Sequence, residues 1–496
     1  MTPSSKSSPK RGDKNLFKRI SPFELFYQLT YLSAMSSAGV SRSKLFELAA
    51  EVESPTAVYF AAINTLVVEF RYDYAEACRA IGVQSKSENL RSFLLRWSDA
   101  LRSGEPMADF LTREAEVQAL DYQNKYERDL ESLKQWTNAF SSIVISVALI
   151  IIIQVITSMV YSSDLKVMSG MAVAGLMMNG LGAWIILRSA PREVLIVPTS
   201  RGSAGQLRTL RFFRLLTPLS GMAVMLLWLI GIPMGWLMIA FAVVVLPIGI
   251  LSGRSDKEVT KKDEEFSTFL RSIGGMASAS GTTLKQAITK LELDSFPMLA
   301  GDIQRLSTRL QALVEPEICW RKFGMESGSR LISDVIAIFY HGVRIGGDPE
   351  RVGYLCSLFT SRTVQLRAKR RLIAGTFTGM TTVMHTVVAV LMVFVLSIVQ
   401  NFAAKVATLL PTSTDAMANA PRMSLGIAEF SPGDLQFLST ITVMMVLMMA
   451  LVASGAIIAA NGGFRLKIMM YLALTVFISG ISFLIVPPLV ASILKV

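Results

Sequence analysis

Apolar residues recur at helix spacing along most of the chain, and several apolar runs are long enough to cross a membrane. A spanning helix needs ~20 consecutive apolar residues. Between the runs, apolar positions repeat every three or four residues, which favours amphipathic helices over strands. The pattern predicts an all-α polytopic membrane protein with about seven spans. The expected spans are 140–161, 167–187, 213–232, 233–251, 373–402, 435–460 and 469–492.

Two polar stretches interrupt the spans, and both have the pattern of a helical bundle. The first covers 21–139 and begins at Ser21-Pro22-Phe23-Glu24, a capping-box sequence with proline at the first helical position. The second covers 252–372 and ends in a long amphipathic helix. The other expected segments are a disordered basic tail at 1–20, four spans within 140–251 around a basic cytoplasmic loop at 188–212, and three spans within 373–496 around an extracytoplasmic loop at 403–434.

Composition supports the membrane assignment and removes several kinds of chemistry. With 52% hydrophobic and 17% charged residues, the chain is too apolar for a soluble globular protein. Three distant cysteines without a CxxC pair indicate neither a disulfide framework nor a zinc site, and two histidines are too few for an imidazole metal site. No Gly-Lys dipeptide exists, so the usual phosphate-binding loop is missing. The sequence therefore predicts no catalytic residues, no cofactor and no metal.

The charge distribution orients the spans. If the N-terminus is cytoplasmic, the basic residues outside are Lys166, Lys405, Arg422 and Lys495, and they are matched by four acidic residues. The whole net charge of +12 then faces the cytoplasm, as the positive-inside rule requires. We expect a multi-pass protein of the plasma membrane with a cytoplasmic N-terminus.

An internal repeat relates the two polar stretches. The segment around Gly39 reads Ser-Ser-Ala-Gly-Val-Ser and the segment around Gly281 reads Ser-Ala-Ser-Gly-Thr-Thr, 242 residues later. Downstream, Gly104-Glu105-Pro106 matches Gly347-Asp348-Pro349 at a separation of 243. Glycine ends helices at little conformational cost, an aspartate can cap the next helix, and proline suits its first position. The predicted structural corners are Gly39, Gly104, Pro106, Gly281, Gly347, Asp348 and Pro349.

Two helical domains with these corners, each followed by membrane helices, resemble the type II secretion system F domain over about 20–160 and 260–402. That family supplies platform proteins of type IV pili, type II secretion systems and archaella. Two domains and seven spans are similar to its archaeal branch. The resemblance implies a non-catalytic platform that couples a hexameric secretion-type ATPase to the insertion of pilin-like or archaellin-like subunits. It also implies a homodimer.

A basic cluster, Arg362, Arg367, Lys369, Arg370 and Arg371, lies just before a predicted span. One interpretation is a juxtamembrane anchor to anionic headgroups. The other is a docking surface for an acidic partner such as the ATPase, whose encounter the charges would speed. Nucleic-acid binding is disfavoured, because no aromatic residues are interleaved with these charges.

Two other function classes remain as alternatives. A secondary transporter would carry its repeats and its ionisable groups within the spans, whereas this repeat is polar and the span centres hold almost no charge. An intramembrane protease could use Ser454 and His385, which both lie in predicted spans. However, Ser-Gly pairs in spans are typical of close helix packing, and we expect His385 to be hydrogen-bonded between helices.

Overall fold

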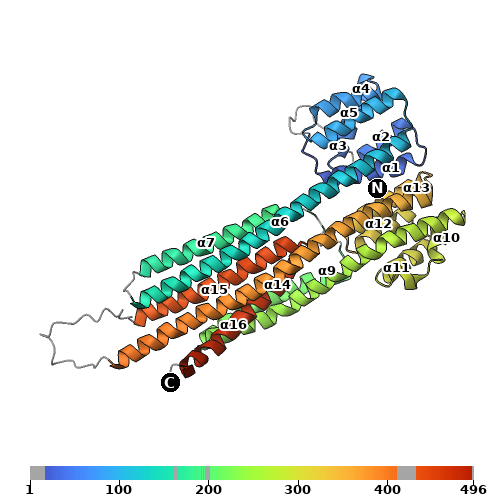
Figure 1. Cartoon of the computed structure of the whole chain (residues 1–496). Helices are drawn as coiled ribbons and strands as arrows, with labels where there is room; N and C mark the ends of the chain where they lie inside the picture. The colour runs from blue at the N-terminus through green and yellow to red at the C-terminus, as the bar shows by residue number, and fades with distance from the viewer. Residues whose placement is uncertain are drawn as a thin grey trace. The chain divides into compact units, whose positions relative to one another are not determined.

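The computed structural model describes residues 17–160, 165–191, 193, 195, 202–409 and 432–493. Within these residues every regular element is a helix, as Figure 1 shows. The chain forms two compact units: residues 1–127 with 261–366, and residues 128–260 with 367–496. We call them the bundle unit and the membrane unit. Each unit therefore combines segments from both halves of the chain.

The first half of the bundle unit is a group of short helices around an aromatic core. The capping box predicted at its start is confirmed: the Ser21 amide donates to the Glu24 carboxylate at 2.8 Å, and the Glu24 amide donates to Ser21 Oγ at 3.2 Å. The rings of Phe46 and Trp97, both fully buried, stack with centroids 4.4 Å apart. The helices are α1 (Pro22–Ser36), α2 (Arg42–Glu51), α3 (Ala57–Phe70), α4 (Tyr74–Gln84), α5 (Glu88–Ser103) and the start of α6 (Met107–Val160).

The second half repeats this helix order. Helix α4 begins at Tyr74 and α12 at Pro316, and α6 begins at Met107 and α14 at Pro349, so that both pairs start 242 positions apart. The repeat inferred from short motifs is thus a repeat of whole helices. The second set is the end of α9 (Met234–Ala279), α10 (Leu284–Thr289), η1 (Leu293–Ser295), α11 (Ala300–Gln311), α12 (Pro316–Glu326), α13 (Arg330–Arg344) and the start of α14 (Pro349–Leu409).

Backbone conformation repeats at the same interval. Among the described residues, two non-glycine residues have positive φ, Arg71 and Leu313, and both have φ 59°. They lie 242 positions apart, each at the end of equivalent helices α3 and α11. A left-handed residue with a side chain is uncommon, so its recurrence at the repeat interval is hard to explain by chance.

The glycine corners follow the same rule, with one correction to the pairing. Gly39 and Gly281 have φ of 67° and 58°. Gly104 has φ 72°, and its counterpart with positive φ is Gly346 (102°), not the Gly347 paired with it from the motif. The structural interval is therefore 242 at both corners. The motif comparison gave 243 because it aligned Pro106 with Pro349, while Pro106 precedes its helix and Pro349 begins its own.

The two halves of the bundle unit pack against each other through an aromatic seam. Phe359 of α14 is 1% exposed and lies 4.5 Å from the ring of Phe26 and 5.9 Å from that of Phe23, centroid to centroid. Nearby, the His341 ring meets Tyr31 edge-on at 6.5 Å. Burial lowers the pKa of His341 and raises the pKa of Tyr31 to about 12, so both rings are neutral at pH 7.

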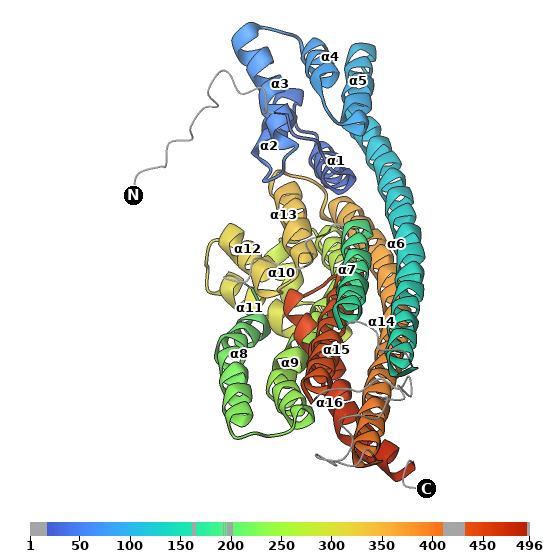
Figure 2. The ribbon, with the colours of Figure 1, turned by 90° about the vertical axis from the view of Figure 1, so that its left-hand side faces the viewer.

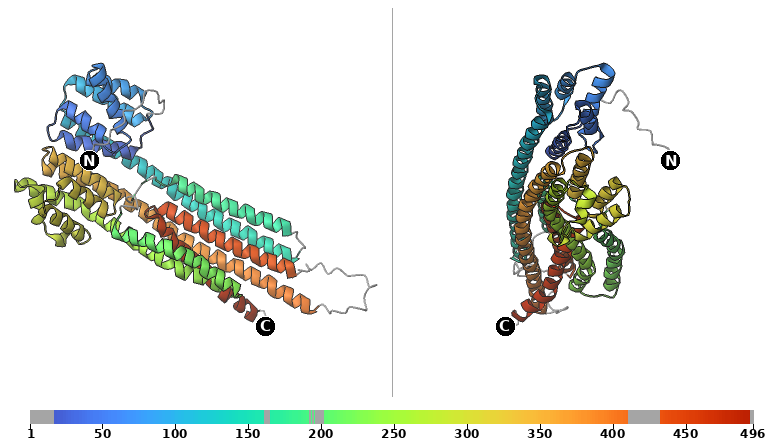
Figure 3. Two further views of the ribbon diagram at one scale, coloured as in Figure 1. Left: turned by 180° about the vertical axis from the view of Figure 1, so that it is seen from behind. Right: turned by 90° about the vertical axis from the view of Figure 1, so that its right-hand side faces the viewer.

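The membrane unit is a set of long apolar helices that run side by side (Figures 1 and 3). Six described helices are long and apolar enough to span a membrane, namely α6, α8, α9, α14, α15 and α16. Within the described residues, the apolar segment of α7, Val173–Ser189, is shorter. An all-α polytopic fold is thus confirmed, while the count of seven stays a prediction. The remaining elements are α7 (Leu165–Ser189), α8 (Ala204–Leu229), α15 (Pro432–Asn461), η2 (Arg465–Lys467) and α16 (Ile468–Ile493).

Helix α16 is held by three neighbours. Its backbone touches that of α9, because a β-carbon on Gly235 would lie 2.9 Å from the carbonyl oxygen of Gly480. His385 of α14 contacts α16 through Nε2, which lies 3.0 Å from Ser479 Oγ and 3.2 Å from the Thr475 carbonyl oxygen. The interhelical role predicted for His385 is confirmed. Ser454 bonds the Ala450 carbonyl and the Thr475 hydroxyl, so its hydrogen bonds support helix packing.

Helices α6, α9 and α14 each continue without a break across the limits between the two units, at residues 127/128, 260/261 and 366/367. The domain limits expected from the sequence, at 139, 251 and 372, lie inside these helices and stay predictions. Most of the predicted tail and much of the loop at 403–434 lie outside the described residues.

Replacing Phe359 by alanine tests the seam. Loss of a buried aromatic side chain is expected to cost about 3–5 kcal/mol in unfolding free energy. The control is Tyr354→Ala on the same helix, because Tyr354 is 52% exposed and its loss is expected to cost less than about 1 kcal/mol. Denaturant unfolding of the purified full chain, followed by tryptophan fluorescence, measures both. Equal destabilisation by the two variants would rule out a stabilising seam.

Candidate functional site in the basic segment of α14

The corner before α14 is a capped helix start. The Asp348 carboxylate accepts hydrogen bonds from the amides of Glu350 (3.4 Å) and Arg351 (3.1 Å), and Pro349 is the first helical residue. The Ser278 hydroxyl, near the end of α9, donates to the same carboxylate at 2.9 Å. This link joins the two corners of the second repeat. The segment is therefore a structural joint between helices.

Glycines let α9 and α14 touch at this joint. A β-carbon on Gly353 would lie 2.7 Å from the Leu270 carbonyl oxygen, and one on Gly274 would collide with the Pro349 carbonyl. In the first repeat, Gly104 caps the end of α5, and Glu105 forms an ion pair with Arg113. The carbonyl oxygen of Pro106 accepts a hydrogen bond from the Phe110 amide in the first turn of α6. Both joints direct a long helix out of a bundle.

Arg370 is the best-connected residue of the basic cluster. It is 5% exposed, and its guanidinium donates to three carbonyl oxygens: Ala460 (3.0 Å), Ala459 (3.1 Å) and Pro191 (3.0 Å). The first two carbonyls belong to the last turn of α15, where a helix lacks its own donors, and a cation there also interacts favourably with the helix dipole. Pro191 follows the end of α7. Arg370 thus ties α14 to the ends of two other helices of the membrane unit.

Arg367 is also engaged inside the membrane unit. Its Nη2 lies 2.6 Å from Glu193 Oε1, and both side chains are nearly buried, at 10% and 6% exposed. Removing two charges from water is unfavourable, and short charge-assisted hydrogen bonds offset that term. Because Glu193 follows Pro191, the segment after α7 is held twice by α14.

The turn between α15 and α16 completes this site. Gly462, with φ 70°, packs on the guanidinium of Arg370, and no side chain would fit between them. The Asp256 carboxylate of α9 accepts hydrogen bonds from the Phe464 amide at 3.3 Å and from Lys467 Nζ at 2.9 Å. We call Glu193, Asp256, Arg367, Arg370 and Lys467 the arginine junction. It joins α9, α14, the end of α7 and the α15–α16 turn.

The other members of the predicted basic cluster are more exposed than Arg367 and Arg370. Lys369 is exposed, while Arg362 and Arg371 are half-buried. Sequence reasoning missed Glu193, Asp256 and Lys467. The available signal was the Gly462-Gly463 pair, which marks a tight turn but does not say which side chain fills it.

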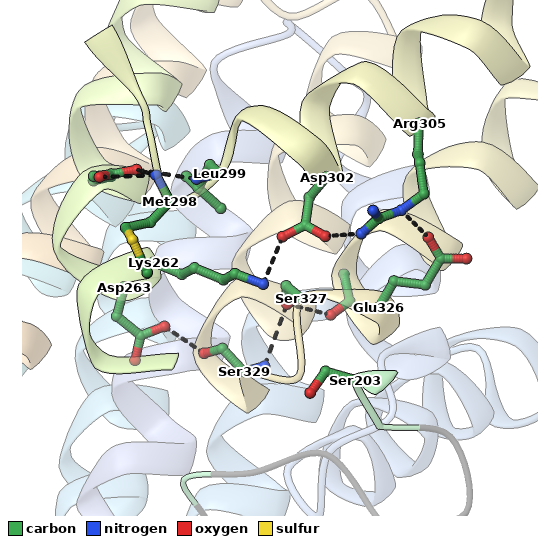
Figure 4. Close-up of polar contacts among 12 residues, drawn as sticks. Ser203, Lys262, Asp263, Met298, Leu299, Asp302, Arg305, Glu326, Ser327 and Ser329 are labelled. Carbon is green, nitrogen blue, oxygen red and sulfur yellow. Dashed lines mark hydrogen bonds and ion pairs between the residues drawn. The ribbon is translucent and has the colours of Figure 1, made fainter. Parts of the chain in front are cut away.

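A second polar cluster, in the bundle unit, has a structural role (Figure 4). Lys262 Nζ lies 2.9 Å from Asp302 Oδ2, and both side chains are nearly fully buried. Asp302 also pairs with Arg305, which pairs with Glu326. Since each charge has an opposite partner, the cluster joins α9, α11 and α12 and offers no acid or base poised for catalysis. Within the described residues no group of three or more His, Cys, Asp or Glu side chains could hold a metal ion.

These features define a class: a multi-pass membrane protein whose duplicated helical bundle continues directly into spans. Residues 29–155 match the family model described as Type II secretion system (T2SS), protein F. That segment covers most of the first bundle and much of α6. The F domain inferred from the sequence is therefore confirmed for the first repeat.

Relatives of known name match a larger part of the chain. A flagella accessory protein J from Methanocaldococcus jannaschii is 27% identical over 341 residues, which is 66% of this chain. A flagella accessory protein J from Methanococcus voltae is 23% identical over 331 residues, or 64% of this chain. In both cases the match spans 59% of the relative's own length. No solved structure matches the chain at a significant level.

The variant Arg370→Ala tests the arginine junction. Three buried carbonyls lose a charged donor, so the free energy of unfolding is expected to fall by roughly 2–4 kcal/mol. Arg370→Lys is expected to recover only part of this loss, because one ammonium cannot reproduce the planar fork. The adjacent exposed Lys369→Ala is the control. The unfolding midpoint of the full chain in detergent reports all three, and a midpoint unchanged by Arg370→Ala would show that the junction adds no stability.

Proposed function

We propose that this chain is the non-catalytic membrane platform of an archaellum-like or type IV pilus-like assembly machine. In this role it couples a cytoplasmic hexameric secretion-type ATPase to the insertion of filament subunits. The F-domain match and the two relatives, both flagella accessory proteins J, support this assignment to an assembly machine. The observation that carries the coupling role is the continuity of α6 and α14. These equivalent helices each run from a bundle into an apolar span.

A continuous helix suits this task for a physical reason. At 1.5 Å per residue, the 54 residues of α6 and the 61 residues of α14 correspond to about 80 Å and about 90 Å. Because hydrogen bonds run along each helix without interruption, a displacement at its bundle end reaches the span without a flexible hinge. The seam joins the two halves of the bundle unit, and the arginine junction passes motion of α14 to the ends of α7 and α15.

The proposed setting follows from charge and resemblance. The protein lies in the plasma membrane with its N-terminus and both bundles in the cytoplasm, where the ATPase is found. Filament subunits contact the spans, and the platform works as a homodimer. Within the basic cluster we assign ATPase docking to the three residues that are at least partly exposed, Arg362, Lys369 and Arg371.

Interrupting α14 tests the coupling. Gln365 is exposed, and proline at this position removes one helical hydrogen bond and kinks the helix. We expect Gln365→Pro to reduce filament assembly in cells at least tenfold while the protein still inserts and still co-purifies with the ATPase. Gln365→Ala, which keeps the helix, should assemble filaments normally. Normal assembly by the proline variant would refute transmission through α14.

Charge reversal tests the docking surface. The variant Arg362→Glu/Lys369→Glu/Arg371→Glu is expected to weaken co-purification of the ATPase about tenfold or more, with the loss growing at low ionic strength. Membrane insertion should be unchanged. The control reverses three exposed charges of the first bundle, Arg42, Arg79 and Arg91. Equal ATPase recovery from both variants would exclude docking at α14 and leave the platform role untouched.

A further inference from the structure

Helix α8 is the least covered span of the membrane unit. Only 6% of its apolar window is buried, against 39–50% in the other five candidate spans. Large side chains along it are exposed, among them Leu215 (66%), Met225 (63%) and Trp228 (65%). This helix therefore presents its surface to lipid in a membrane.

The start of α8 carries three exposed arginines, Arg208, Arg211 and Arg214, at intervals of three residues. Residues three apart lie near one another on a helix surface, so they form one stripe. The helix contains no Asp or Glu. In the described part of the chain, none of the three arginines makes a hydrogen bond or an ion pair, in contrast to the buried Arg367 and Arg370 of α14.

The neighbouring helix α9 carries two more exposed cations. Helices α8 and α9 run side by side (Figures 2 and 3), and a β-carbon on Gly205 would lie 2.8 Å from Ser255 Oγ. Arg254 and Lys257 flank this contact and are exposed. The acidic residues between and after them, Asp256 and Glu258, have partners of their own. The five exposed cations thus lie at the same end of the α8–α9 pair, and we call them the basic patch.

The patch lies at the depth of lipid headgroups. The turn between α8 and α9 covers residues 230–233, so the two helices are antiparallel. Counting 1.5 Å per residue from that turn, the five cations lie about 24–35 Å along the two helices. The hydrocarbon core is about 30 Å thick. With the turn at one surface, Arg208, Arg254 and Lys257 therefore lie in the headgroup layer of the other side, and the long side chains of Arg211 and Arg214 can extend to it.

We propose that Arg208, Arg211 and Arg214 form a binding site for the phosphate of an anionic lipid, to which Arg254 and Lys257 add positive charge from the same end of α9. Guanidinium groups match phosphate oxygens in a bidentate geometry, and apolar side chains of α8 continue from the stripe toward the bilayer centre, where acyl chains lie. We choose a lipid as the ligand because the arginine stripe is followed on the same helix by exposed apolar side chains. A soluble phosphate or an acidic protein would have no contact with that apolar surface. The site is independent of the proposed platform role.

Native mass spectrometry of the full chain, titrated in detergent with phosphatidylglycerol or phosphatidylcholine, tests the site. The expected result is tighter binding of the first phosphatidylglycerol. Each arginine should contribute roughly fivefold, so Arg208→Gln/Arg211→Gln/Arg214→Gln is expected to weaken it on the order of 100-fold, with phosphatidylcholine unaffected. A matched control, Arg42→Gln/Arg79→Gln/Arg91→Gln, removes equal charge from the bundle unit and should bind like the unmodified chain.

Three outcomes would overturn the proposal. The first is equal binding of the two lipids, or equal losses in the two triple variants, which would reduce the effect to overall charge. The second is displacement of phosphatidylglycerol by millimolar inorganic phosphate, which would indicate a general phosphate site. The third is unchanged lipid binding together with lost ATPase co-purification in the α8 variant, which would identify the patch as a protein-docking surface. Loss of folding is excluded beforehand by equal unfolding midpoints of the two variants.

Discussion

The guanidinium of Arg370 is the contact on which one end of the membrane unit depends. A buried positive charge is tolerated only with good partners, and here the partners are three carbonyl oxygens at the ends of α15 and after α7. The carbonyls of Ala459 and Ala460 lie in the last turn of α15, where the helix supplies no donor. The guanidinium and the carbonyl oxygens are each other's hydrogen-bond partners. If either moved away, the other would be left buried without those hydrogen bonds. Gly462 is part of this arrangement, because any larger residue would displace the guanidinium.

Duplication explains why the protein has two long helices of this kind. The repeat interval of 242 holds for the starts of α4 and α12 and of α6 and α14, for both glycine corners, and for the left-handed residues Arg71 and Leu313. A bundle that ends in α6 therefore has a copy that ends in α14, and the aromatic seam around Phe359 packs the copies together. The family model matches residues 29–155, which include most of the first copy. The second copy has the same backbone corners.

Arginines in this chain have two different roles, and the neighbours decide which. Arg367 and Arg370 lie among carbonyls and a carboxylate inside the membrane unit, where they join helices. Arg208, Arg211 and Arg214 lie on α8, which contains no acidic residue, and their side chains are exposed on the surface of the membrane unit. Composition alone treats these five residues as equivalent. A basic segment beside a span is consequently a poor guide to docking until the burial of each side chain is known.

The sequence by itself determined the features that depend on neighbouring residues: the long apolar helices, the capping box at Ser21, the glycine corners and the aspartate cap of α14. Helix period, capping and left-handed backbone are local, so a short window contains their whole cause. Only the tertiary structure decided that Arg370 reaches carbonyls 89, 90 and 179 positions away, and that Phe359 packs on α1. Such pairings depend on how helices pack, which no local pattern encodes. For the same reason the sequence paired Gly104 with Gly347, and only the backbone φ angles showed that its counterpart is Gly346.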